Sequence, residues 1–285
     1  MSSYEELKSH IKQYNKVIVA FSGGIDSYFV LKASIDSLDK ENVLAVTGDS
    51  PSLKRSEREL TIKLAGAVGA NHRIIFTEEL NNRNYYNNPD NRCFFCKNEL
   101  YDRLSAMKND LEYNYVLDGT NYDDMNDYRP GIKASEIHGI KSPLSELKFT
   151  KQEIRNISHE LGLEIWNKPA SPCLSSRIPH GQKVTQEKLA MVENAEEVLK
   201  KFGFKEFRVR HYEISNNDST NNTVTRFARI EISALEMEKM FNTDLFIMID
   251  ENLQYLGYDF VTLDMGGLRS GSLNRQNLLP VLNQN

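Results

Sequence analysis

Short apolar runs alternate with longer amphipathic stretches over the first 165 residues of the chain. The apolar runs are rich in β-branched residues, which predicts strands, and the stretches between them have the apolar spacing of helices. This alternation indicates an α/β domain with a doubly wound parallel sheet, covered by helices on both faces. The expected strands are 16–21, 43–48, 72–76 and 113–119, and the expected helices are 26–38, 56–69, 96–108 and 150–162.

Two long segments separate predicted strands from the helices that follow them. Residues 77–92 follow the third strand and residues 119–143 follow the fourth, and both are expected to be loops. Connections of this length in a compact domain are usually functional. Because both follow strands of a parallel sheet, they are expected at its carboxyl edge, where this fold class binds ligands.

The pattern changes after residue 186 and predicts a smaller α+β domain. Its asparagine-rich stretch 215–223 is expected to be a surface loop. The resulting domain prediction is an α/β domain over 1–170 and a smaller domain over 171–285. The elements expected there are a helix at 187–203, strands at 207–214 and 226–232, helical segments within 234–256, and a strand at 259–265.

Composition narrows the functional classes. The length of 285 residues suits about two domains. The net charge of −5 argues against a protein that a basic surface holds on nucleic acid. No apolar run approaches the roughly 20 residues of a membrane helix, and the first residues lack a signal peptide. We therefore expect a cytoplasmic protein whose partners include neither nucleic acid nor a membrane.

The segment FSGGIDS, residues 21–27, follows the first predicted strand and opens a predicted helix. Glycine lets backbone N–H groups approach an anion closely, and the start of a helix presents unpaired N–H groups. Ser22, Gly23, Gly24 and Ser27 therefore suit a bound phosphate. The alternative is a tight strand–helix turn in which Ser27 is the N-cap.

The charged residue of this segment is Asp26, whereas the common ATPase loop carries a lysine. A carboxylate beside a phosphate is explained if it holds Mg²⁺ that bridges phosphate oxygens. The segment resembles the pyrophosphate loop (PP-loop) of the N-type ATP pyrophosphatases. The resemblance implies that ATP is cut between its α- and β-phosphates and that AMP is transferred to a substrate oxygen. Thr47 follows the second strand, where this fold receives adenosine.

The three cysteines are Cys93, Cys96 and Cys173, the first two as Cys-x-x-Cys in a polar, asparagine-rich segment expected to be a loop. An odd number makes a disulfide framework unattractive. A zinc site needs a fourth ligand, for which His180 is available. A thioredoxin-like pair leaves Cys173 unused. An iron–sulfur cluster on three thiolates leaves one iron open to bind hydrosulfide, and a persulfide or sacrificial cysteine is a further alternative.

A larger set of motifs covers nearly the whole chain. The segments SGGIDS, RCFFCKNELYDRL, LDGTNYDDMNDYRPG, SPLSEL, KPASPCLSSRIPHG, FRVRHY and LDMGGLRSGSLN occur in this order. Together they resemble the LarE family, sulfur transferases that build the nickel-pincer nucleotide of lactate racemase. The resemblance implies that the carboxylates of pyridinium-3,5-dicarboxylate mononucleotide are adenylated and then thiolated. It also implies a sulfide donor and a homo-hexamer.

The resemblance sharpens the interpretation of the cysteines. Family members with only the cysteine matching Cys173 sacrifice its sulfur, whereas three-cysteine members are thought to carry a [4Fe–4S] cluster. The pattern here predicts a catalytic cluster on Cys93, Cys96 and Cys173. A sacrificial cysteine without a cluster remains the alternative.

The family motifs contain further candidate site residues. Arg208 and Arg210 alternate along a predicted strand, so both point to one face. They form a solvated edge, make salt bridges or, with Arg177, clamp the substrate phosphate, and the resemblance to the family favours the clamp. Gly119 and Arg129 belong to the GTNYDDMNDYRPG block. The polar residues of that block and its preceding strand are turn formers or Mg²⁺ ligands: Asp118, Asn121, Asp123, Asp124 and Asp127.

Two rival functions share part of this evidence. A tRNA thiolase has the same loop and cluster but predicts a basic RNA-binding extension, and none is visible in the sequence. A regulatory module that has lost catalysis predicts ATP binding without pyrophosphate release.

Overall fold

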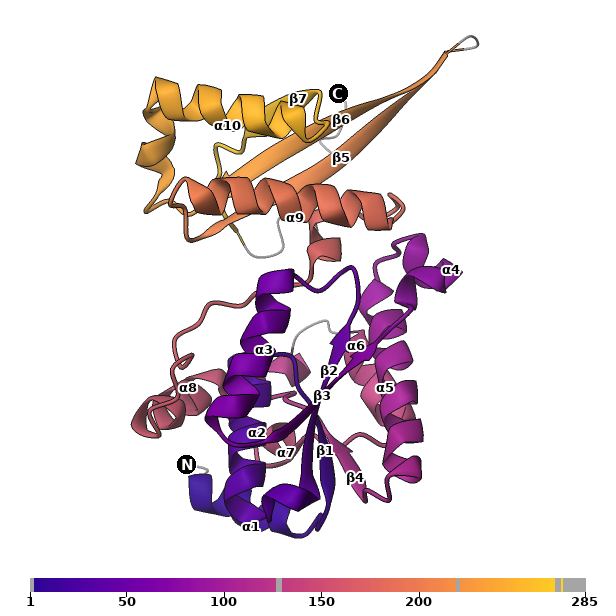
Figure 1. Ribbon diagram of the computed structural model, residues 1–285, viewed down its shortest axis with the longest axis vertical. Helices are drawn as coiled ribbons and strands as arrows, with labels where there is room; N and C mark the ends of the chain where they lie inside the picture. Colours follow the sequence, from indigo (N-terminus) through magenta and orange to yellow (C-terminus); the bar gives the residue numbers. More distant parts are fainter. Residues whose placement is uncertain (1–2, 127–129, 219–220, 270–272, 274–285) are drawn as a thin grey trace, which may run out of the picture. The chain divides into compact units, whose positions relative to one another are not determined.

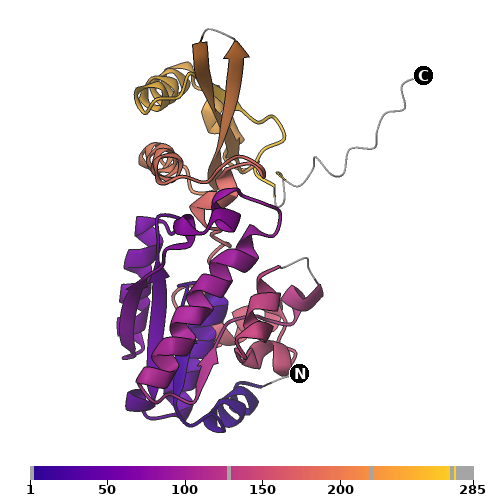
Figure 2. The same ribbon diagram turned by 90° about the vertical axis from the view of Figure 1, so that its right-hand side faces the viewer.

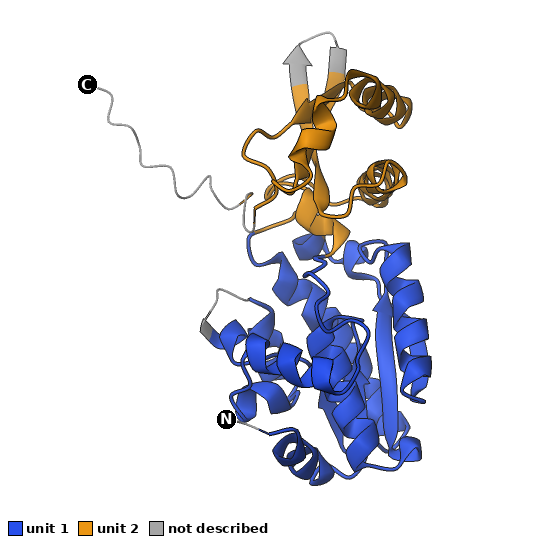
Figure 3. Cartoon of the chain, turned by 90° about the vertical axis from the view of Figure 1, so that its left-hand side faces the viewer, with its two compact units in different colours: residues 1–85, 90–172 blue, residues 86–89, 173–285 orange. Residues whose placement is uncertain are grey.

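The computed structural model forms two compact units (Figures 1 and 3). Unit 1 comprises residues 1–85 and 90–172, and unit 2 comprises residues 86–89 and 173–285. The residues that the structure describes are 3–126, 130–218, 221–269 and 273.

The sheet of unit 1 consists of parallel strands in the order β3-β2-β1-β4 (Figure 1). Strand β1 lies in the centre and pairs with β2 on one side and β4 on the other. Because all the strands run the same way, the loops that follow them emerge at one edge of the sheet. The strands are β1 (Val17–Ala20), β2 (Val43–Asp49), β3 (Asn71–Phe76) and β4 (Tyr115–Leu117).

Both faces of the central strands β1 and β2 are buried. Val17 and Val19 of β1 belong to one apolar cluster, whereas Ile18 between them belongs to another. Side chains of a strand alternate between the two faces, so a strand with no polar face needs a cover on each side. The predicted doubly wound α/β fold is confirmed.

Helices of unit 1 lie on both sides of the sheet in Figure 1. The first of them, α1, was not predicted, although Ser3 and Glu6 form a capping box and Leu7 and Ile11 are buried. The helices are α1 (Tyr4–Lys12), α2 (Ile25–Ser37), α3 (Arg55–Ala67), α4 (Arg83–Tyr86), α5 (Arg92–Asp110), α6 (Gly131–Ile137), α7 (Pro143–Glu146) and α8 (Lys151–Glu160).

The two segments expected to be loops contain helical turns. Within 77–92 lie η2 (Glu79–Asn81) and α4, and α5 begins at Arg92, whereas the sequence predicted a helix from residue 96. The earlier start has an apolar cause, because Phe94 packs against the same cluster as Leu104. The prediction of a loop around Cys93 was therefore wrong.

Unit 2 has a sheet in the order β5-β6-β7, with β5 antiparallel and β7 parallel to β6. Figure 2 shows α9 and α10 on the same side of the β5–β6 hairpin. Their buried residues, including Leu199 and Leu253, share one cluster with Val209 and Ile230 of the strands. The elements are η4 (Leu174–Arg177), α9 (Gln186–Lys201), β5 (Phe207–Asp218), β6 (Asn221–Ile232), η5 (Met237–Phe241), α10 (Thr243–Tyr255) and β7 (Phe260–Leu263).

The hairpin is longer than the sequence predicted. Residues 215–218 and 221–223, expected in a surface loop, continue the strands, and Asn216 pairs with Thr223. Backbone hydrogen bonds between antiparallel strands do not require apolar side chains, so an asparagine-rich composition is compatible with a ladder.

None of the described helices is long and apolar enough to span a membrane.

Candidate active site

The glycine loop connects β1 to α2 at the carboxyl edge of the sheet. Gly23 has a φ of +72°, and a Cβ on it would lie 2.9 Å from Thr61 Cγ2 of α3. A side chain is disfavoured at this position both by the backbone conformation and by the helix beside it. Gly24 is the N-cap of α2 and makes no side-chain cap hydrogen bond. The predicted strand–loop–helix context of the phosphate loop is present.

Two serine hydroxyls hold the loop in shape. Ser27 Oγ accepts from the Ser22 backbone N–H at 3.2 Å and donates to the Gly24 carbonyl at 3.1 Å. Ser22 Oγ lies 3.1 Å from Ser27 Oγ and 3.4 Å from the Gly24 nitrogen, from which it accepts. The alternative in which Ser27 is the N-cap is wrong, because Gly24 takes that position.

The loop after β4 packs directly on the start of α2. A Cβ on Gly119 would lie 2.6 Å from the Ser27 backbone nitrogen and 2.9 Å from the carbonyl carbon of Asp26. Backbone atoms of a helix cannot move aside as a flexible side chain does. Glycine at 119 is therefore required for the close approach of the two segments.

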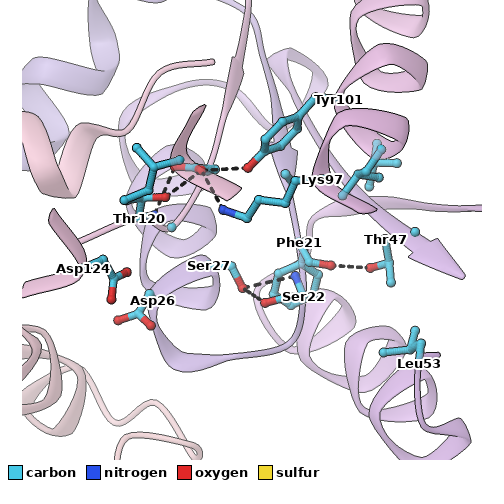
Figure 4. A pocket seen from close by; sticks show the side chains of 17 residues that line it. Phe21, Ser22, Asp26, Ser27, Thr47, Leu53, Lys97, Tyr101, Thr120 and Asp124 are labelled. Atoms are coloured by element: carbon cyan, nitrogen blue, oxygen red, sulfur yellow. Dashed lines mark hydrogen bonds and ion pairs between the residues drawn. The ribbon is translucent and has the colours of Figure 1, made fainter. Parts of the chain in front are cut away.

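A cavity of about 290 Å³ opens beside this loop (Figure 4). Thr47, at the end of β2, lies on its wall and donates its hydroxyl to the Phe21 carbonyl at 2.7 Å. Thr47 Oγ1 also lies 2.9 Å from Nε2 of His72, which donates here because the threonine hydroxyl proton is directed at Phe21. Burial lowers the pKa of His72. The residues that line the cavity are Ala20, Phe21, Ser22, Asp26, Ser27, Val46, Thr47, Gly48, Leu53, Lys97, Leu100, Tyr101, Asp118, Gly119, Thr120, Asp124 and Ile132.

Asp118 is the most heavily hydrogen-bonded carboxylate of the cavity. Its Oδ2 accepts from Tyr101 at 2.8 Å and from the Thr120 hydroxyl at 2.7 Å, and its Oδ1 accepts from Ser142 at 2.7 Å. Lys97 Nζ lies 3.8 Å away and points into the same space in Figure 4. Charge and hydrogen bonds are both compensated, as buried carboxylates require. Asp118 therefore organises the wall of the cavity.

Asp26 is partly exposed and already has two partners. Lys151, the first residue of α8, forms an ion pair with its Oδ2, and Asn121 donates to its Oδ1 at 3.3 Å. Neither contact was predicted, because Lys151 follows Asp26 by 125 residues. The only sequence signal was the Thr150–Glu153 pattern of a helix start.

The acidic loop is divided by the structure. Asn121 and Asp124 exchange backbone-to-side-chain hydrogen bonds at 3.2 and 3.1 Å, so Asp124 lies beside the amide that contacts Asp26. Asp123 instead accepts from the backbone N–H of Lys151 at 2.8 Å. Two further candidates, Asp127 and Arg129, lie outside the described residues.

A second lysine that was not predicted reaches the glycine loop. Lys168 donates to the Gly23 carbonyl at 3.4 Å and forms an ion pair with Glu57, in the first turn of α3. The loop itself contains no lysine. The ammonium that contacts it comes from a residue 145 positions further along the chain.

Cys93 and Cys96 lie at the start of α5, three residues apart and thus on one side of the helix. Cys93 is exposed and Cys96 is partly buried. Tyr101, one wall of the cavity, has its pKa raised by burial, then by Asp118, and further by the nearby Cys96 thiol. Cys96 directly precedes Lys97, which lines the cavity.

Cys173 begins the second segment of unit 2, immediately after Pro172 of unit 1, and is partly buried. The structure does not fix the two units relative to each other, so the convergence of the three cysteines stays a prediction. Within the described part of the chain, no group of three His, Cys, Asp or Glu side chains is arranged to hold a metal ion.

The segment after Cys173 is fixed within unit 2 by Asn88. This buried amide donates to the carbonyls of Ile178, Pro179 and Gln182 at 3.2, 2.7 and 3.0 Å. Its φ of +56° is a conformation that asparagine tolerates better than most residues. Residue 88 belongs to unit 2, although it precedes Cys93 by only five positions.

The three arginines proposed as a clamp differ in their partners. Arg177 pairs with Glu196 at 2.8 Å, and Arg210 pairs with Glu231 at 2.8 Å, all four side chains being buried. Arg208 donates to a backbone carbonyl, and burial, Arg210 and Arg177 together lower its pKa. Salt bridges, one of the alternatives for Arg208 and Arg210, are therefore present at Arg210, and Arg177 also forms one.

A comparison with protein-family models finds no match. An uncharacterized protein of Synechocystis is 41% identical over 274 residues, 96% of this chain and 97% of that protein. The pyridinium-3,5-bisthiocarboxylic acid mononucleotide synthase of Lactiplantibacillus plantarum is 38% identical over 270 residues, 94% of this chain and 92% of the synthase. An uncharacterized protein of Methanocaldococcus jannaschii is 31% identical over 210 residues, 73% of this chain and 79% of that protein. At this identity and coverage the chain belongs to the LarE family of the synthase, as its motifs predicted.

Proposed function

We propose that this protein is an ATP-dependent, AMP-forming sulfurtransferase that converts the carboxylates of pyridinium-3,5-dicarboxylate mononucleotide into thiocarboxylates for a nickel-pincer cofactor. The proposal is supported by the synthase to which the chain is related over 94% of its length. It is further supported by the phosphate-type loop beside the cavity, described above.

One structural observation carries the proposal. Helix α5 bears Cys93 and Cys96 at its start, and the same helix supplies Lys97, Leu100 and Tyr101 to the cavity that the glycine loop also lines. An enzyme that activates a carboxylate with ATP and then thiolates it needs its sulfur chemistry beside its nucleotide. A helix shared by both supports that arrangement.

The reaction has two steps. A carboxylate oxygen of the substrate attacks the α-phosphorus of ATP, the bond to the β-phosphate oxygen breaks, and pyrophosphate leaves. A sulfide nucleophile then attacks the acyl carbon, AMP leaves with the bonding electron pair, and a thiocarboxylate remains. In this scheme Ser22, Gly23, Gly24 and Ser27 hold the pyrophosphate with their N–H and O–H groups, and Thr47 lies beside the adenosine.

Asp26 and Asp124 are the residues that would hold Mg²⁺. Both are carboxylates that contact Asn121, and carboxylate oxygens together with phosphate oxygens are suitable Mg²⁺ ligands. The ion would neutralise the leaving pyrophosphate. The ion pair between Asp26 and Lys151 must then loosen, which the partial exposure of both side chains permits.

We propose that Cys93, Cys96 and Cys173 hold a [4Fe–4S] cluster. Three thiolates are a suitable donor set, and a cluster bound this way keeps one iron open for hydrosulfide. Chain connectivity supports the grouping, because residues 86–89 of unit 2 end four residues before Cys93. Loss of sulfur from Cys173 in a single turnover is the alternative.

The remaining expectations stay predictions. Arg208 is proposed to bind the substrate phosphate, with Arg177 and Arg210 supporting it through their charge. Arg129 and Gly119 are proposed to border the nucleotide, the latter through the close packing described above. A homo-hexamer, a separate sulfide donor and a cytoplasmic location are retained as predictions.

The test is a turnover assay under anaerobic conditions with ATP, Mg²⁺, sulfide and the dicarboxylate mononucleotide. We expect AMP, pyrophosphate and thiocarboxylate over many turnovers, with cluster absorption in the visible range that disappears in Cys93→Ser. If each chain forms only one thiocarboxylate and Cys173 loses its sulfur, Cys173 is a sacrificial sulfur donor and the proposal of a catalytic cluster is wrong. Absence of AMP with this substrate, but its release with unmodified tRNA, would favour a tRNA thiolase.

A further inference from the structure

We infer that Lys168 binds the terminal phosphates of ATP and so supplies the cation that the glycine loop itself lacks. The inference rests on the proposed function, because it assigns a role within the same nucleotide site. It adds a phosphate-binding residue from outside the loop.

The contacts of Lys168 bring its ammonium to the loop backbone. Nζ donates to the Gly23 carbonyl and pairs with Glu57, and the Lys168 and Glu57 side chains are 20% and 17% exposed. An ammonium has three N–H donors, and the described residues provide acceptors for two of these at Gly23 and Glu57. The third is available for a phosphate oxygen.

The position of Gly23 indicates which phosphates Lys168 reaches. Ser22, Asp26 and Ser27 line the cavity beside Thr47, whereas neither Gly23 nor Lys168 is among its described lining residues. A nucleoside monophosphate within the cavity therefore ends before Lys168. The β- and γ-phosphates extend along the loop towards Gly23.

The carboxylate of Glu57 does not cancel this role. In the absence of nucleotide it neutralises a partly buried ammonium that would otherwise be costly to desolvate. When an anion with several charges arrives, the ammonium can contact both the phosphate and Glu57, because its donors point in different directions. Glu57 thereby holds Lys168 at the loop.

A purely structural salt bridge is the competing explanation, and the chain contains a matched example of one. Lys63 of α3 pairs with Glu164 at 2.6 Å. This bridge joins the same two segments as the Glu57–Lys168 pair, α3 and the stretch after α8, but its side chains are 65% and 44% exposed. The two lysines therefore differ in their access to the loop, while their linking role is the same.

The experiment measures binding of ATP, pyrophosphate and AMP to the full chain with Mg²⁺ by titration calorimetry. In Lys168→Met we expect the Kd of ATP and of pyrophosphate to rise about tenfold, the usual effect of one lost charge-assisted contact. The Kd of AMP should be unchanged. Lys168→Arg, which keeps the charge, should recover much of the lost pyrophosphate affinity, and Lys63→Met should bind all three ligands like the unmodified protein.

Each outcome decides between the explanations. Unchanged ATP and pyrophosphate affinity in Lys168→Met overturns the inference, as does an equal loss for AMP. The same loss in Lys63→Met also overturns it, because the effect would then come from the link between the segments. If the unmodified chain binds neither ATP nor pyrophosphate, the proposed function itself fails.

Discussion

Two charged pairs, one in each unit, differ strongly in their exposure to solvent. Beside the glycine loop of unit 1, Lys151 and Asp26 have side chains that are 34% and 22% exposed. In the sheet of unit 2, Arg210 and Glu231 form a pair that is 4% and 0% exposed. The Lys151–Asp26 pair lies where a ligand can replace one partner, whereas the Arg210–Glu231 pair is enclosed by protein.

This difference separates binding groups from structural ones. An exposed ion pair contributes little to folding and can be exchanged for a ligand contact at small cost. A buried pair has lost its hydration, so removing one member leaves a desolvated charge. The sequence alone does not distinguish an exchangeable ion pair from a buried one, because both kinds use the same types of charged residue.

The largest predicted effect is on the buried pair. Replacement in Glu231→Ala should lower the stability of unit 2 by about 3–5 kcal/mol, because Arg210 and Arg229 lose this carboxylate. The measurement is hydrogen exchange of the β5 and β6 amides under native conditions. The chain has one tryptophan, Trp166 in unit 1, so its fluorescence reports on the other unit separately.

A matched control for Glu231 lies in the same unit. Glu197 pairs with Lys200 at 3.0 Å on α9, with both side chains well exposed. Glu197→Ala should change stability by less than about 0.5 kcal/mol. Equal effects from the two replacements would show that burial does not separate these pairs.

A smaller effect on stability, with a larger one on binding, is predicted where the glycine loop meets β4. The added methyl group in Gly119→Ala would press on the backbone of Asp26 and Ser27 and should cost about 1–3 kcal/mol. ATP affinity should fall at least about tenfold, because the shift moves the loop that we propose binds phosphate. Thermal unfolding followed by Trp166 and calorimetric ATP binding measure the two effects.

Gly66, within α3, provides the comparison. A Cβ there meets no atom within 4 Å, so Gly66→Ala should stabilise unit 1 by up to about 1 kcal/mol through helix propensity. Its ATP binding should be that of the unmodified chain. Retention of full ATP affinity in Gly119→Ala would contradict the importance of this close approach.

Local signals in the sequence were sufficient to predict the fold and the strand–loop–helix geometry around the glycine loop. Val17, Ile18 and Val19 are adjacent apolar residues, and such a short β-branched run is typical of a strand buried on both faces. Gly23 and Gly24 follow directly, so the strand, the loop and the helix could be predicted from one continuous segment. The start of α5 was misjudged because polar residues around Cys93 conceal the apolar contact of Phe94.

Contacts between distant segments were not predictable in the same way. Lys168 opens the motif KPASPCLSSRIPHG and Lys151 begins α8, but neither local pattern indicates a contact with the loop. Only the folded chain brings the two lysines near Gly23 and Asp26. For the same reason the alternation of Arg208 and Arg210 indicated a shared face without identifying their partners. Arg210 pairs with Glu231 of the neighbouring strand β6, and the sequence of β5 alone does not reveal this partner.

The smallest predicted effect concerns Arg208, the exception among the unit 2 arginines. Burial and the charges of Arg210 and Arg177 lower its pKa, so its positive charge opposes folding, and an anion beside it would relieve that cost. Arg208→Met should therefore leave folding intact, unlike Glu231→Ala, while the Kd of the dicarboxylate mononucleotide rises about tenfold. ATP binding should not change.

The dephosphorylated substrate should bind the unmodified protein and Arg208→Met equally, because the contact that differs is the one to phosphate. Arg226 of β6, about one-third exposed, offers the control replacement Arg226→Met, which should bind both forms normally. If the phosphate group contributes equally to substrate affinity in the unmodified protein, in Arg208→Met and in Arg226→Met, Arg208 does not bind that phosphate. Its role would then be structural, like that of the buried pairs.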